Sequence, residues 1–382
     1  MRLVGIITNR NQTETGGAMT AFDAASRGEV EKVEQQATRG FLAAMLEKAL
    51  DDAVWSLSEC RELGALVDGN PAWERAFLER ADTVLQAAFS RGDAFALKEI
   101  HRALFWLYEL HVLDGASPRA VNQFDPTLTR LRARIERAWL AHAQRQAEPE
   151  RVAADSESVV SALRTLWAQH PVAAHPLFDF LEKDASREQI VTFFKSDSAL
   201  NIRFFDLLVY SMIGSRMGVR KELAQNFWDE SGRGDAQRGH VSLFQYLLDT
   251  VGVERASDHH ASELNWQGLA GYNLFMLCCV NRQHYFKLLG VMAMTELLDP
   301  SQYAKLARGC ERVGLGAENE LEYYLEHVTI DVVHGEGWLA NVISPVVEET
   351  PEVAQEIVLG AALRLASCNE YYDALYARIL DR

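Results

Sequence analysis

Three residues that can bind a metal ion lie close together late in the sequence: His327, Asp331 and His334. Residues separated by four and by seven positions share one face of an α-helix, so both imidazoles and the carboxylate would point the same way. Apolar residues flank all three, and polar groups in apolar surroundings need a partner. The spacing predicts a metal-binding helix; the alternative is a solvated helix face that carries these residues by chance.

Three further donors lie upstream: Glu230, His240 and Glu296. Glu296 stands in an otherwise apolar segment, where a carboxylate is costly unless it is protonated, paired or bound to a metal. The alternative is an exposed Glu at a helix end just before Pro300. The six residues together offer nitrogen and oxygen donors without a thiolate, which suits non-haem iron or manganese better than structural zinc.

The segment between Glu230 and His240 must bend if both residues bind the same cluster. In a continuous helix they would lie ~15 Å apart and point in different directions. Gly232 and Gly234 lie between them, and glycine lets a helix break and restart at a new angle. The alternative is an ordinary glycine-rich turn. We assign Asp229, next to Glu230, to a supporting or surface role.

Composition limits the classes of partner. The chain has 382 residues, of which 48% are hydrophobic, and a net charge of −16. This charge argues against nucleic acid and against an anionic membrane surface as the main partner. No run of 18 apolar residues occurs, and the five cysteines include no C-x-x-C pair. We therefore expect a cytoplasmic protein with reduced thiols and no membrane partner.

Helical periodicity dominates the chain and predicts an all-α fold. We expect residues 1–23 to be disordered, 24–148 to form a helical N-terminal domain, and 155–382 to form the bundle that carries the ligands. A polar segment with a proline near residue 150 is the expected linker. The helices expected around the ligands cover residues 186–197, 198–216, 218–228, 237–252, 264–288, 289–298, 300–313 and 317–345.

The ordered set of donors resembles the haem-oxygenase-like diiron oxidases and oxygenases over roughly residues 157–350. The resemblance is carried by Asp229-Glu-Ser-Gly-Arg-Gly, by Met294-Thr-Glu and by Glu326-His-Val-Thr-Ile-Asp-Val-Val-His. It implies a compact helical bundle that holds two iron ions in place of haem and uses O2 as co-substrate. It also implies six iron ligands, with one carboxylate bridging and no catalytic residue beyond them: Glu230, His240, Glu296, His327, Asp331 and His334.

An N-terminal helical domain before the diiron domain is similar to the layout of N-oxygenase members, in which that domain supports dimerisation. Those members carry an additional glutamate ligand on an earlier helix. Here that helix offers only Asp206, slightly displaced, so Asp206 is either the seventh ligand or no seventh ligand exists. The aromatic residues considered for lining a cavity, with core packing favoured for each, are Trp228, Phe244, Phe275, Tyr324 and Trp338.

The resemblance implies N-oxygenation of a small amine- or guanidine-containing, amino-acid-derived metabolite in natural-product biosynthesis. A homodimer and an external electron donor are expected with it. One alternative is oxidative C–C or C–N cleavage of an amino-acid-derived or fatty substrate. The other is a non-catalytic helical interaction module.

Overall fold

The computed structural model describes residues 36–381, and the chain divides into two compact units, Met1–Lys48 and Ala49–Arg382. In the first unit, residues 36–47 are helical. The expected disorder of residues 1–23 lies outside the described residues. The boundary expected near residue 150 falls inside the second unit and stays a prediction.

The second unit is built from helices, and the described residues contain no strand, which confirms the all-α fold. Its α-helices are α2 (Leu50–Ser58), α3 (Leu63–Asp68), α4 (Pro71–Arg91), α5 (Ala94–Glu109), α6 (Pro126–Gln146), α7 (Ser156–Gln169), α8 (Pro176–Lys183), α9 (Arg187–Met212), α10 (Arg220–Glu230), α11 (His240–Thr250), α12 (Trp266–Val280), α13 (Tyr285–Arg312), α14 (Glu322–Gly337), α15 (Ser344–Glu349) and α16 (Ala354–Leu380). Single turns of 3-10 helix connect them: η1 (Ala120–Asn122), η2 (Pro171–Ala174), η3 (Met217–Val219), η4 (Ala236–Arg238), η5 (Ala261–Glu263), η6 (Arg282–His284), η7 (Ala317–Asn319) and η9 (Pro351–Val353). A π-helix, η8 (Trp338–Ile343), joins α14 to α15.

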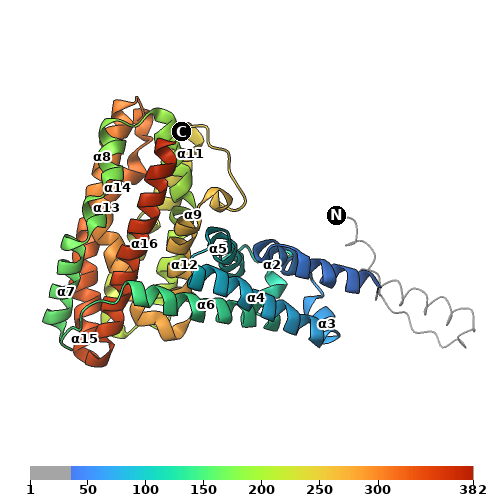
Figure 1. The fold of residues 1–382 in the computed structure, drawn as a ribbon. Helices are drawn as coiled ribbons and strands as arrows, with labels where there is room; N and C mark the ends of the chain where they lie inside the picture. Colours follow the sequence, from blue (N-terminus) through green and yellow to red (C-terminus); the bar gives the residue numbers. More distant parts are fainter. Residues whose placement is uncertain (1–35, 382) are drawn as a thin grey trace, which may run out of the picture. The chain divides into compact units, whose positions relative to one another are not determined.

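Helices α2 to α6 lie beside the later bundle, and α5 packs against α12 (Figure 1). The buried carboxylate of Glu109 joins the two regions. It accepts hydrogen bonds from the Tyr272 hydroxyl and from Arg203, each 2.7 Å long. Hydrogen bonds with a charged partner are stronger than neutral ones, so this contact fixes α5 on the bundle.

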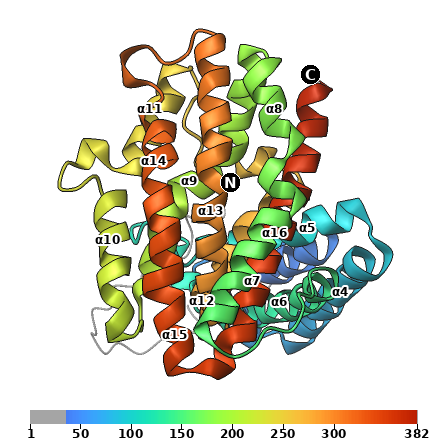
Figure 2. The ribbon, with the colours of Figure 1, turned by 90° about the vertical axis from the view of Figure 1, so that its left-hand side faces the viewer.

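Helix α13 runs through the bundle and packs against α8, α14 and α16 (Figure 2). Gly290 on α13 and Gly360 on α16 allow the two backbones to approach closely. A Cβ atom at Gly290 would overlap the Ile357 carbonyl oxygen, and one at Gly360 would overlap the Lys287 carbonyl oxygen. The close contact holds α13, which carries Glu296, in a fixed position against α16.

Several predicted helix ranges were wrong. The range 264–288 spans the end of α12 at Val280 and the start of α13 at Tyr285. The ranges 186–197 and 198–216 form one helix, α9, and the ranges 289–298 and 300–313 form one helix, α13, which continues through Pro300. Proline lacks an N–H group and disfavours helical geometry before it, but packing on several sides overrides this local preference. The range 317–345 instead contains α14 and then the wider turn of η8.

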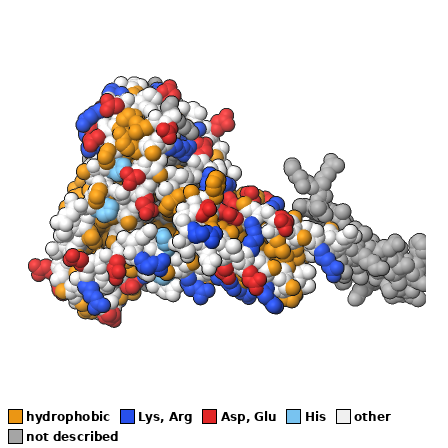
Figure 3. All heavy atoms as spheres, viewed as in Figure 1, with side chains coloured by type: hydrophobic (Ala, Val, Ile, Leu, Met, Phe, Trp, Pro, Cys, Tyr) orange, Lys and Arg blue, Asp and Glu red, His pale blue; other side chains and the backbone are white. Residues whose placement is uncertain are grey.

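Among the described residues, no helix is both long and apolar enough to cross a bilayer. On the face drawn in Figure 3, basic and acidic side chains are interspersed over the helices of the second unit. The expected absence of nucleic-acid and membrane partners stays a prediction.

Candidate metal centre

The turn between α10 and α11 brings Glu230 and His240 together. Helix α10 ends at Glu230 and α11 begins at His240. Gly232 (φ +81°) and Gly234 (φ +96°) take left-handed conformations in the turn between them, which glycine adopts without strain. The predicted break of the helix is therefore confirmed, and it places Glu230 Oε2 2.9 Å from His240 Nδ1.

His327 completes a first triad with Glu230 and His240, in which the donor atoms lie within 4.8 Å of one another. Its Nδ1 lies 2.6 Å from the Tyr323 carbonyl oxygen and donates to it, so Nε2 keeps a free lone pair. Burial, together with His240, lowers the pKa of His327 to about 4. A neutral imidazole with a free lone pair is the form that binds a metal.

Glu296, Asp331 and His334 form a second triad, again with donor atoms within 4.8 Å. Glu296 comes from α13 and the other two from α14, where they share one face as predicted. His334 Nδ1 lies 3.5 Å from Glu296 Oε2 and 3.9 Å from Asp331 Oδ1. Its Nε2 lies 3.2 Å from Asp229 Oδ2, so Asp229 orients the imidazole from behind, as predicted.

The unpartnered atoms of the two triads fit metal ions. All six side chains are at most 6% exposed. Asp331 Oδ1 and His334 Nδ1 are buried without a hydrogen-bond partner, and His240 Nδ1 meets Glu230 Oε2 without the geometry of a hydrogen bond; all three face other donors of their triads. Buried polar atoms of native proteins nearly always have a partner, and one cation per triad would supply it.

The pKa shifts of Asp331 and His334 also fit a site that binds a cation. Burial, and then the neighbouring carboxylates of Glu296 and Asp299, raise the pKa of Asp331 well above its usual value. Burial disfavours the charged form of His334, yet the neighbouring carboxylates of Glu296 and Asp229 raise its pKa to about 9. Without a metal, a proton on His334 partly offsets the negative charge, and a cation would replace that proton.

Asp206 does not join either triad. Its carboxylate lies 3.5 Å from Arg203 and is 38% exposed. Arg203 also pairs with Glu109, so Asp206 belongs to the contact between α9 and α5. The structure therefore does not bring the candidate seventh ligand to the other six.

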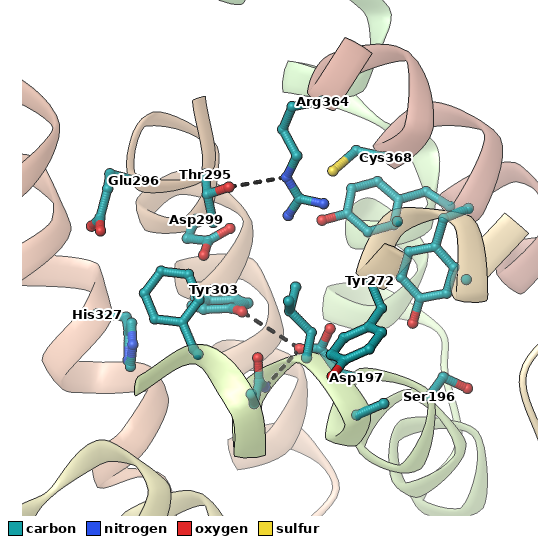
Figure 4. A pocket seen from close by; sticks show the side chains of 18 of the residues that line it. Ser196, Asp197, Tyr272, Thr295, Glu296, Asp299, Tyr303, His327, Arg364 and Cys368 are labelled. Carbon is teal, nitrogen blue, oxygen red and sulfur yellow. Dashed lines mark hydrogen bonds between the residues drawn. The ribbon is translucent and has the colours of Figure 1, made fainter. Parts of the chain in front are cut away.

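A cavity of ≈ 50 Å³ lies beside the triads, and Glu230, Glu296, His327 and Asp331 form part of its wall. The cavity is also lined by charged residues that sequence reasoning missed: Asp197, Asp299 and Arg364 (Figure 4). Of these, only Asp299 gave a sequence signal, since it follows the candidate ligand Glu296 by one helical turn.

The predicted aromatic candidates do not line this cavity. Phe244, Phe275, Tyr324 and Trp338 are buried core residues, and Trp228 is 50% exposed. Tyrosines from other positions line it instead: Tyr272, Tyr303, Tyr323, Tyr371 and Tyr372.

Comparison with known proteins supports the resemblance. Residues 191–368 match the family model described as an iron-containing redox enzyme. The chain is also similar to the nitrosourea synthase of Streptomyces achromogenes subsp. streptozoticus, with 31% identity over 150 residues. That match covers 36% of this chain and only 30% of the relative. All six donors lie within this matched segment, so the similarity to the iron-containing redox enzymes covers the whole candidate metal centre.

Proposed function

We propose that this protein is an O2-activating oxygenase that holds two iron ions, one in each triad, and oxygenates nitrogen in an amine- or guanidine-containing, amino-acid-derived metabolite. The observation that carries the proposal is the pair of buried triads beside one cavity lined in part by charged side chains. Three imidazoles and three carboxylates form a donor set suited to iron. The nitrosourea synthase supports nitrogen as the atom oxidised.

The residues of the chain would prepare this chemistry in three ways. Asp229 and the Tyr323 carbonyl fix the orientation of His334 and His327. The surrounding tyrosines exclude bulk water from the cavity. Asp197 and Asp299 offer negative charge to a cationic nitrogen.

Bound iron would supply the redox chemistry that reduces O2. One oxygen atom would go to nitrogen and the other to water, which consumes two electrons and two protons. An external electron donor must provide these two electrons in every turnover.

Oxidative C–C or C–N cleavage is the second candidate. The position of Asp206 favours it, since the additional carboxylate ligand of N-oxygenase members has no counterpart in either triad. A non-catalytic helical module does not explain six buried donors, three of which have an atom without a hydrogen-bond partner.

Iron binding tests the metal site. Anaerobic titration with Fe(II) should give about two irons per chain, and His327→Ala and Glu296→Ala should each lose iron from one triad. His284→Ala, which changes a histidine outside both triads, should keep the full iron content. Unchanged iron content in the two ligand variants would overturn the proposal.

Product analysis tests the reaction. The iron-loaded protein, an electron donor and 18O-labelled O2 are mixed with candidate amines and guanidines, and the products are examined by mass spectrometry. N-oxygenation predicts a product that gains one labelled oxygen on nitrogen. Loss of a carbon fragment would support the second candidate instead.

A further inference from the structure

Arg364 is a buried cation whose outer donors have no partner. It lies on α16 and is 6% exposed. Its Nε donates to Thr295 Oγ1 over 3.0 Å, and its guanidinium carbon lies 4.8 Å from the centre of the Phe275 ring. These contacts fix the plane of the guanidinium group. Among the described residues, Nη1 and Nη2 make no hydrogen bond and no ion pair within 4.0 Å.

The free edge of Arg364 faces the cavity. In Figure 4 the Nη atoms point into the space between Arg364 and Asp299, while Glu296 and His327 lie on the far side of Asp299. The hydroxyl of Tyr371, which also comes from α16 and lines the cavity, is buried without a hydrogen-bond partner. At this end of the cavity, the Nη atoms of Arg364 and the hydroxyl of Tyr371 can therefore donate hydrogen bonds, but no acceptor in the part of the chain that the structure describes receives them.

The carboxylates of Asp197 and Asp299 line the same cavity but do not pair with Arg364. Asp197 Oδ2 accepts hydrogen bonds from Asn201 (3.0 Å) and Tyr303 (3.4 Å). Neither Asp197 nor Asp299 lies within 4.0 Å of Arg364 in an ion pair. The cavity thus has an anion-binding end at Arg364 and acidic groups between that end and the triads.

We propose that Arg364 binds the carboxylate of an amino-acid-type substrate through Nη1 and Nη2 and so directs the opposite end of the molecule toward the two triads. A guanidinium edge with two parallel N–H donors matches a carboxylate in both geometry and charge. Asp197 and Asp299 bind the cationic nitrogen of the same molecule. The small volume of the cavity disfavours a long alkyl chain.

The inference deepens the proposed function and rests on it for the chemistry, but the binding step can be measured alone. Calorimetric titration of the Fe(II)-loaded protein without O2 compares L-lysine with cadaverine and L-arginine with agmatine. Each pair differs by the carboxylate alone. Because two hydrogen bonds to a charged group would be gained, the amino acid should bind about 10- to 100-fold more tightly than its decarboxylated counterpart in at least one of the two pairs.

Arg364→Gln should abolish this preference while leaving the affinity for the decarboxylated probe within about threefold, and Arg364→Lys should keep part of it. Arg378→Gln makes the same change elsewhere on α16, where the side chain contacts Glu263, and should keep the full preference. Thermal melting of each variant verifies that it is folded.

Two results would overturn the proposal: no preference for a carboxylate in the unchanged protein, or an equal preference in Arg364→Gln. The second result would indicate that the carboxylate binds iron directly. If the preference depends on Arg364 but no oxygen is incorporated into any product, the substrate anchor stands and the proposed oxygenase function fails.

Discussion

Substitution of Gly232 by alanine tests whether the turn between α10 and α11 assembles the first triad. A Cβ atom there would overlap the Asp235 carbonyl oxygen and the Gly239 amide nitrogen and would lie 2.6 Å from the Arg238 carbonyl carbon. These are backbone atoms, so no side-chain rotation relieves the overlap. The turn must open, and this separates Glu230 from His240.

The effect has two parts of different size. A left-handed conformation costs alanine about 1–2 kcal/mol, which lowers the melting temperature of a unit this large by only a few degrees. Overlap with backbone adds a displacement of the turn, which should remove iron from the first triad and leave the second. Gly232→Ala should therefore bind about one iron per chain.

Gly314→Ala is the matched control. Gly314 has φ +78°, and a Cβ atom added there would meet no other atom within 4 Å, so this variant carries the conformational cost alone. Iron content is measured by metal analysis after anaerobic loading, alongside melting curves. Two irons per chain in Gly232→Ala, or equal iron loss in Gly314→Ala, would refute the argument.

Two further predictions follow from single contacts. Asp229→Asn should weaken iron binding in the second triad by about 10- to 100-fold, because His334 loses its charged acceptor. The control Asp249→Asn changes a surface ion pair with Arg255 and should leave iron binding unchanged. Anaerobic titration with Fe(II) measures the affinity of both variants. Burial lowers the pKa of His101 to about 3, so the folded state resists protonation and stability is lost as pH falls below 6.5. Between pH 7 and pH 5, the free energy of unfolding should fall by about 2 kcal/mol less in His101→Gln than in the unchanged protein. Denaturant unfolding of both proteins at the two pH values measures this difference.

The six donors could be predicted from sequence because local rules place most of them. His327, Asp331 and His334 share a face by helical spacing alone. Glu230 and His240 needed one inference, that the glycines between them break the helix, and positive φ angles at Gly232 and Gly234 confirm it. Residue type and order were therefore enough for the donors.

The cavity could not be predicted in the same way. Asp197, Asp299 and Arg364 come from α9, α13 and α16, and only the packing of these helices brings them together. The spacing of Asp299 from Glu296 gave a signal only if the helix continues, and Pro300 predicts that the helix ends before Asp299. Tertiary contacts carry α13 through the proline and turn Asp299 toward the cavity.

The charge around the cavity bears on the number of metal ions. Among the described residues, its wall contains the carboxylates of Glu230, Glu296, Asp331, Asp197 and Asp299 and the single guanidinium of Arg364. With neutral imidazoles and every carboxylate ionised, this would leave four negative charges in a buried site. Burial, and then the neighbouring carboxylates, raise the pKa of Asp299 and Asp331. One Fe(II) ion would leave half of that charge uncompensated, whereas two would neutralise it. Uncompensated buried charge is strongly destabilising, so the charge balance supports two cations. With two cations the cavity would be neutral, which suits a substrate that carries both a carboxylate and a cationic nitrogen.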